Sequence, residues 1–115
     1  PLIRRLAQIP AEEQFTTSIT LGELLYGASK KGSTRLLERV REIVLQAQQV
    51  LPFDELAAEM YGPLRASLES RGLPLDEPDL RIASIALSRN LILVTGNLRH
   101  FERVPDLRLE NWITT

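Results

Sequence analysis

The sequence predicts an α/β fold with a mainly parallel sheet. Short apolar segments alternate along the chain with amphipathic helical segments, which is the order typical of β–α units. The run Leu91–Val94 is apolar without alternation, as in a strand covered on both faces of a parallel sheet. The chain has 115 residues, of which 43% are hydrophobic, and this is sufficient for a single domain spanning residues 1–115 with its own core.

The first half of the chain is predicted to contain a strand and two helices. Residues 1–14 look like the end of a helix running into a loop, so we expect that the chain begins part-way through a domain. Apolar and polar residues alternate over residues 15–20, which indicates a strand. Thr20 and Glu23 have the spacing of a capping box and predict a helix start. Residues 34–49 form the clearest amphipathic helix.

The elements that follow are marked by caps and breakers. Residues 50–53 predict a short strand, and Asp54 is placed to cap the next helix. Pro63 is expected to kink that helix and Gly72 to end it. A final edge strand is predicted at residues 107–112.

The other predicted elements are arranged around the segment from residue 73 to residue 101, which contains a helix, a strand and a polar loop. Its helix begins among acidic residues and a proline, which suit the positive end of a helix dipole and a first helical turn (Asp76, Glu77, Pro78 and Asp79). Asn90 is a plausible left-handed stop for this helix, and the strand Leu91–Val94 follows. A polar loop at residues 95–97 comes directly after the strand.

Composition excludes several classes of function. The net charge is −1, so no chain-wide basic field indicates nucleic acid, and any such site must be local. The absence of cysteine excludes disulfides, thiolate metal sites and a cysteine nucleophile. No apolar run is long enough to cross a bilayer and no secretory signal is visible, so we expect a cytoplasmic protein without a membrane partner.

The predicted topology brings oxygen-bearing side chains to one edge of the sheet. A helix that leads into a parallel strand has its N-terminus beside the C-terminal end of that strand, where open α/β sheets bind ligands. Asp79 should therefore face Thr95 and Asn97, and Glu23, early in a helix that follows a strand, should reach the same edge. Carboxylates with water suit Mg²⁺ or Mn²⁺, and Glu23 and Asp79, with Asn97 or Thr95 holding a water, would form such a site.

Each of these residues also has a purely structural interpretation. Glu23 could merely complete the capping box with Thr20, and Asp79 could merely oppose the helix dipole. Asn97 could be an ordinary turn residue beside Gly96.

The basic residues near this edge are also open to two interpretations. His100 is the single histidine and lacks partners for a triad or zinc site, so we expect it to pack beside Phe101 or to meet a phosphate. Four basic residues could bind a polyanion or form a solvated rim (Lys30, Lys31, Arg99 and Arg103).

Three motifs, in this order and spacing, resemble the PIN-domain family, and most closely its VapC-type toxins. They are TLGELLYGA (Thr20–Ala28), LPLDEPDLRIASIAL (Leu73–Leu87) and LVTGNLRHFERVPDLRLENW (Leu93–Trp112). The resemblance covers nearly the whole chain. It implies a three-layer α/β/α fold and a Mg²⁺- or Mn²⁺-dependent endoribonuclease acting on structured cellular RNA. It also implies a homodimer and a VapB-like antitoxin that blocks the active site.

The resemblance assigns roles residue by residue. Glu23 matches the acidic residue of the family's GEL-type motif, and Asp79 the acidic residue that opens its DLxIA helix. Asn97 stands where many members have Asp, and Thr95 matches the hydroxyl residue of the same loop. The family begins with a strand bearing a metal-binding Asp, for which this chain has no counterpart. We therefore expect an N-terminally truncated domain with a first strand missing and, for this chain as given, weak activity or none.

The expected reaction is hydrolysis of RNA phosphodiesters with metal held by Glu23, Asp79 and the missing Asp. Arg99, His100 and Lys30 would position the RNA backbone. The alternative is a non-catalytic PIN-like module that binds RNA or an antitoxin without cutting, which Asn97 and the missing Asp favour. A third interpretation, a receiver-like domain, would need an Asp at the end of a strand, and neither residues 94–97 nor residues 15–21 contain one.

Overall fold

The computed structural model describes residues 14–46 and 49–111. Helices alternate with short strands in the order β1 (Phe15–Thr17), α2 (Ser18–Lys30), α3 (Thr34–Gln46), β2 (Gln49–Leu51), α4 (Glu55–Ser70), α5 (Glu77–Ser88), β3 (Ile92–Val94), α6 (Leu98–Phe101) and β4 (Arg108–Glu110). The helix end predicted for the start of the chain falls on residues 1–13 and lies outside the described residues.

The strands pair in parallel, as the sequence predicts. β1 pairs with β2, with Phe15 opposite Gln49, and β3 pairs with β4, with Ile92 opposite Arg108. Among the described residues these are two separate two-stranded sheets, because no described strand bonds to both β1 and β3. The sequence predicted one mainly parallel sheet, and the described residues form two parallel pairs of strands.

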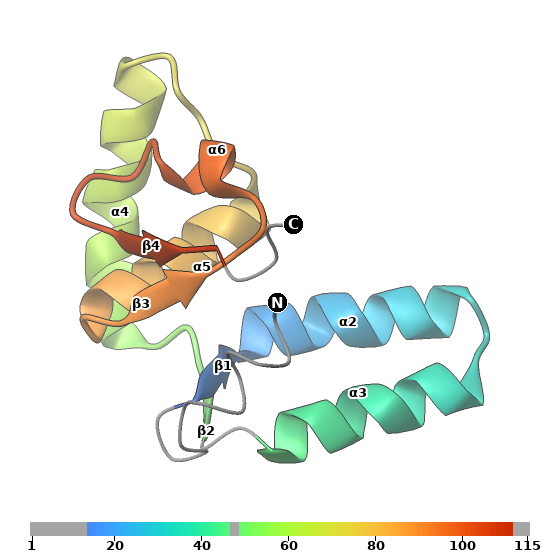
Figure 1. The fold of residues 1–115 in the computed structure, drawn as a ribbon. Helices are drawn as coiled ribbons and strands as arrows, with labels where there is room; N and C mark the ends of the chain where they lie inside the picture. Colours follow the sequence, from blue (N-terminus) through green and yellow to red (C-terminus); the bar gives the residue numbers. More distant parts are fainter. Residues whose placement is uncertain (1–13, 47–48, 112–115) are drawn as a thin grey trace.

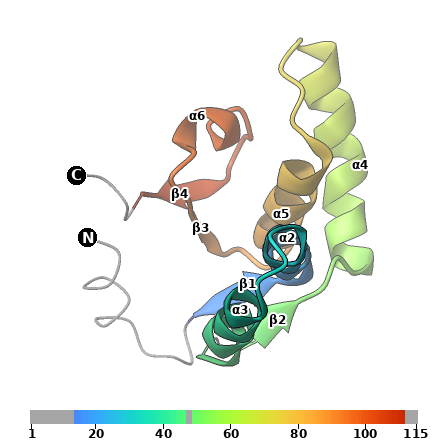
Figure 2. The ribbon, with the colours of Figure 1, turned by 90° about the vertical axis from the view of Figure 1, so that its right-hand side faces the viewer.

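The described chain has two regions (Figures 1 and 2). The hairpin region, residues 15–51, consists of the antiparallel helices α2 and α3 with the β1–β2 pair at their base. The platform, residues 55–111, has α4 and α5 packed on one face of the β3–β4 pair (Figure 2). The base of α2 meets α5, and this contact joins the two regions.

The main core lies within the platform. Leu68 and Ala83 are completely buried at its centre, and Phe101 and Val104 close it from the C-terminal segment. A second cluster of Leu51, Ala57 and Ile85 joins β2 to α4 and α5. These clusters follow the apolar spacing of the two helices, which sets one side of each against the other.

The covering of β3 differs from the prediction. Leu93 packs against the main core and Leu91 against the second cluster, but Ile92 between them is 45% exposed. Successive side chains of a strand point to opposite faces, and the described helices cover one face of this pair (Figure 2). The prediction that both faces are covered is therefore wrong for Ile92.

Most of the predicted caps and stops are confirmed. Asp54 accepts a hydrogen bond from the Ala57 N–H at 3.0 Å and begins α4, which continues through Pro63. Gly72 follows α4 at φ +70° and Asn90 follows α5 at φ +54°, both in the left-handed region that ends helices.

One cap is wrong. α2 begins at Ser18, and its cap is Thr17, whose hydroxyl accepts the Thr20 N–H at 3.0 Å. The capping box of Thr20 and Glu23 does not form, because Thr17, one turn earlier, already caps the helix. Glu23 thus lies in the second turn of α2 and is not needed for the helix start.

Candidate functional site

Asp79 lies in the first turn of α5, where the sequence places it. Asp76 occupies the N-cap position, but its side chain makes no capping hydrogen bond, and Pro78 fits the first turn because it needs no N–H partner there. The positive end of the helix dipole stabilises the Asp79 carboxylate at this position. The side chain of Asp79 is 24% exposed, so it is shielded from much of the solvent but still accessible.

Asp79, His100 and Asn97 come together in space. The Asp79 Oδ2 lies 3.5 Å from the His100 Nδ1, and the Asn97 Nδ2 lies 2.7 Å from that same nitrogen. The Asn97 amide nitrogen can donate to Nδ1, an arrangement in which the imidazole proton lies on Nε2. In that tautomer the Asp79 oxygen receives no proton from His100.

The loop after β3 is held in shape by Thr95. Its N–H donates to the Glu110 carbonyl at 3.0 Å, and its hydroxyl accepts the Asn97 N–H at 3.0 Å. Thr95 therefore orients the backbone that carries Asn97. The structure thus joins Asp79, Asn97, Thr95 and His100 at the C-terminal end of β3, at the edge that the topology predicts.

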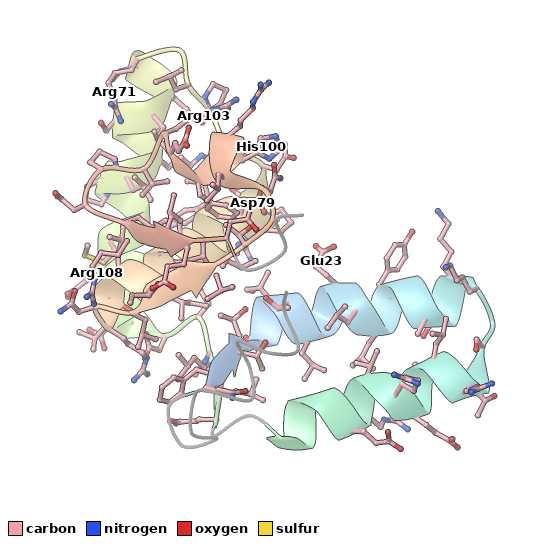
Figure 3. All side chains as sticks on the ribbon, viewed as in Figure 1. Glu23, Arg71, Asp79, His100, Arg103 and Arg108 are labelled. Carbon is pink, nitrogen blue, oxygen red and sulfur yellow. The ribbon has the colours of Figure 1, made fainter. Side chains whose placement is uncertain are left out.

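Glu23 approaches the same side of the molecule from α2. Figure 3 shows Glu23 on the side of α2 that faces the platform, with Asp79 and His100 across the opening. The Glu23 side chain is exposed and has no ion pair or hydrogen bond within the described part of the chain. A carboxylate without a structural partner is free to bind a ligand.

A pocket of about 560 Å³ separates Glu23 from the start of α5. Five of its lining residues belong to α2 and three to the first turns of α5 (Ser18, Ile19, Gly22, Glu23, Tyr26, Glu77, Pro78 and Arg81). Pro78, the residue before Asp79, lines this pocket, whereas Asp79 itself does not. Glu23 therefore borders this opening directly, and Asp79 follows Pro78, which is one of the lining residues.

Glu77 and Arg81 form part of this pocket, although the sequence indicated no role for them. Glu77 accepts from the Tyr61 hydroxyl, from Arg65 at 3.0 Å and from Arg81 at 3.1 Å. The hydrogen bond from Tyr61, with the charges of the two arginines, holds the pKa of Glu77 below its ordinary value. The i, i+4 spacing of Glu77 and Arg81 was a sequence signal for this pair, but Tyr61 and Arg65 belong to another helix.

The remaining predicted contacts with substrate lie in different places. Arg99 is exposed on α6 beside His100. Lys30 is at the C-terminal end of α2, where its ammonium lies 5.9 Å from the Tyr26 ring centre. That end of the helix points away from α5 (Figure 1), but the Lys30 ammonium lies beside Tyr26, which lines the pocket.

The donors at this edge are chemically suited to a hard divalent cation. Carboxylate and amide oxygens are the ligands that Mg²⁺ and Mn²⁺ prefer, and Mg²⁺ is usually held by one or two carboxylates with water completing its shell. Within residues 14–46 and 49–111, no group of three acidic, histidine or cysteine side chains is placed to hold a metal ion. Glu23, Asp79 and the Asn97 Oδ1 offer the types of oxygen ligand that the sparser arrangement uses.

None of the helices in the described ranges has both the length and the apolar character needed to span a bilayer.

Comparison with known proteins shows the family to which the chain is similar. The family model described as PIN domain matches residues 2–107. A tRNA(fMet)-specific endonuclease VapC from Salmonella typhimurium is 40% identical over 110 residues, which are 96% of this chain and 83% of that protein. A ribonuclease VapC2 from Rickettsia felis is 41% identical over 96 residues, 84% of this chain and 72% of that protein. The solved structure of DNA-bound VapBC from Salmonella typhimurium has a TM-score of 0.88 at 40% identity, covering 96% of this chain and 83% of that one.

Proposed function

The chain belongs to the PIN-domain family, among the VapC ribonucleases, and we propose that it hydrolyses RNA phosphodiester bonds with a divalent metal ion held by Glu23 and Asp79. The convergence of Asp79, His100 and Asn97 at the end of β3, with Glu23 facing them from α2, carries this proposal. The printed names of the relatives, an endonuclease and a ribonuclease, support the same reaction.

The side chains at this edge of the sheet have different proposed roles in the reaction. The Asp79 and Glu23 carboxylates, with the Asn97 amide oxygen, supply oxygen ligands for Mg²⁺ or Mn²⁺. When bound, such an ion supplies charge stabilisation on the scissile phosphate and lowers the pKa of a water molecule. His100 presents its Nε2 proton to a phosphate oxygen, and Arg99, exposed beside it, binds the RNA backbone. Thr95 keeps the Asn97 backbone in place.

The partners follow from the relatives. The structures of the relatives are titled VapBC, and in two cases their titles state that DNA is bound. We therefore propose that this chain is the toxin of a toxin–antitoxin pair and is inhibited by a VapB-like antitoxin. A homodimer is part of the same proposal, and action on cellular RNA implies a location in the cytoplasm.

A second function remains open because of Asn97. This residue stands where many PIN domains have an acid, which removes one negative ligand from the site and favours a module that binds RNA or antitoxin without cutting. Manganese titration separates the two functions. A nuclease binds Mn²⁺ at the Asp79 edge and needs it for turnover, whereas a binding module retains its RNA affinity in EDTA and shows no turnover with Mn²⁺.

The decisive experiment compares two acid-to-amide substitutions in the full-length protein. We expect Glu23→Gln and Asp79→Asn each to lower cleavage by more than about a hundredfold, because losing even an outer partner of a metal ligand costs about 10–100-fold. Both variants should melt close to the wild type, because neither carboxylate serves a cap in the described structure. Cleavage of a structured RNA in Mn²⁺ and a thermal melt measure these effects.

Glu38→Gln is the matched control, because Glu38 is exposed on α3 and also changes an acid to an amide. It should leave cleavage at the wild-type rate. Wild-type cleavage by both Glu23→Gln and Asp79→Asn would end the proposal.

A further inference from the structure

The arginines of the platform are held in two different ways. Arg65, Arg81 and Arg89 pair with carboxylates of Glu69, Glu77 and Asp54, which neutralise their charge. A second set donates to backbone carbonyls instead. Arg103 Nη1 lies 2.7 Å from the Pro74 carbonyl, and Arg71 Nη2 lies 3.5 Å from the Arg103 carbonyl. A carbonyl orients a guanidinium but leaves its full positive charge uncompensated.

Arg71 and Arg103 are anchored on firm backbone. Arg103 stands between the buried residues Phe101 and Val104, each 4% exposed. Arg71 is the C-cap of α4, and its N–H bonds the Ser67 carbonyl at 3.1 Å. The guanidinium of Arg103 is thus oriented by a bond of 2.7 Å, and that of Arg71 is held more loosely at 3.5 Å. Orientation of a cation lowers the entropy lost when it binds an anion.

These arginines continue a path that starts at the active site. Figure 3 shows Asp79, His100, Arg103 and Arg71 in succession, from the start of α5 across α6 to the C-terminal end of α4. Arg99 on α6 adds a third exposed guanidinium without a carboxylate partner in the described ranges. Glu102 and Asp106, both exposed, are acidic side chains of the same segment.

We propose that Arg103 and Arg71 bind successive phosphates of the RNA strand on one side of the scissile bond. This inference rests on the proposed function, since the strand must enter the site at Asp79. A polymeric anion extending from the scissile phosphate matches a line of oriented cations, and an arginine fork binds phosphate oxygens in pairs. The bound RNA therefore passes over α6 to the end of α4, and this face extends the footprint of the enzyme beyond its metal site.

The test removes both charges and keeps a polar side chain at each position. In Arg71→Gln/Arg103→Gln, each guanidinium is replaced by a neutral amide. Arg108→Gln is the matched control: Arg108 also donates to a carbonyl, that of Asn90, and it lies on another side of the platform (Figure 3). Binding of a structured hairpin RNA is measured in EDTA over a series of salt concentrations, so that no cleavage intervenes.

The double variant should bind the hairpin about tenfold more weakly, and the slope of log affinity against log salt should fall by about 1.4 to 1.8, the value for two lost phosphate contacts. Arg108→Gln should keep the wild-type slope. Arg71→Lys/Arg103→Lys retains both charges and should recover most of the slope, which separates lost charge from lost folding. In Mn²⁺, the double Gln variant should raise KM for the hairpin more than it lowers kcat.

Two results would overturn this inference. One is a double Gln variant with the affinity and salt slope of the wild type. The other is a variant that binds RNA normally but loses binding to a polyglutamate peptide, which would make this face a protein-binding surface. The proposed function fails separately, by the absence of Mn²⁺-dependent cleavage in the wild type, whatever the salt slopes show.

Discussion

The two acids of the site stand on helices that are held very differently. α5, which carries Asp79, has five buried residues and packs on α4, β3 and α2. α2, which carries Glu23, has one buried residue, Ala28, and exposes Leu24 by 43% and Tyr26 by 63%. One half of the site is therefore fixed by the core, and the other half is carried by a helix with few buried contacts, the kind of element that opens at low free-energy cost.

The hydrogen bonds and charges show the same difference. Asp79 has His100 beside it, and its helix start is tied to α4 by the bonds from Tyr61 and Arg65 to Glu77. Glu23 has no such partner in the described part of the chain. Under the proposed function, metal and substrate would find Asp79 already in position, whereas the position of Glu23 depends on the packing of α2 against α5.

The largest stability effect should come from the α5 side. Ile85→Ala should lower the free energy of unfolding by about 2–5 kcal/mol, since Ile85 is 1% exposed where β2, α4 and α5 meet. Leu24→Ala on α2 should change it by less than about 0.5 kcal/mol, because Leu24 is 43% exposed. Urea unfolding of both variants measures the difference. Equal losses would show that the two helices are held alike.

A smaller effect is expected from stiffening α2. Gly27 lies inside this helix, and a Cβ added there would meet no atom within 4 Å. Gly27→Ala should therefore raise the free energy of unfolding by about 0.5–1 kcal/mol, because alanine loses less backbone entropy in a helix. Chemical denaturation measures the gain. Gly32→Ala is the contrasting variant and should destabilise, since Gly32 has a φ of +65°. A loss of stability in Gly27→Ala would contradict the open packing of α2.

The smallest effect is a pH dependence that comes from two carboxylates, at the starts of α4 and α5. The Tyr61 hydrogen bond lowers the pKa of Glu77, and the Ala57 N–H, followed by Arg89, lowers the pKa of Asp54. A lowered pKa means that the unfolded chain binds protons more readily. The stabilisation is therefore complete above the ordinary carboxyl pKa of about 4 and is lost as pH falls below it.

Glu77→Gln should flatten the fall in melting temperature between about pH 5 and pH 3, because the neutral amide has no proton to take up. Melting curves of wild type and variant across this range measure the change. Glu38→Gln on α3 should leave the curve as it is. An equally steep fall in the Glu77→Gln variant would show that this carboxylate contributes nothing to acid sensitivity.

The sequence predicted helix caps and stops correctly where they depend on residues close along the chain. The Asp54 cap, the acidic start of α5 and the stop at Asn90 depend on neighbours within a few residues, and all three are present. The capping box of Thr20 and Glu23 failed for a local reason as well, since two hydroxyl residues a turn apart compete for the helix start. Its failure removes the structural interpretation of Glu23 and leaves the functional one as a proposal.

The sequence by itself determined the order of strands and helices, the parallel pairing and the motifs that carry the family membership, because these follow from periodicity and from residues close along the chain. Tertiary structure alone decided which side chains meet: His100 with Asp79, Tyr61 with Glu77, and Arg103 with the Pro74 carbonyl. All three contacts join residues that are 16 to 29 positions apart in the chain. They exist only once helices and loops have packed against one another.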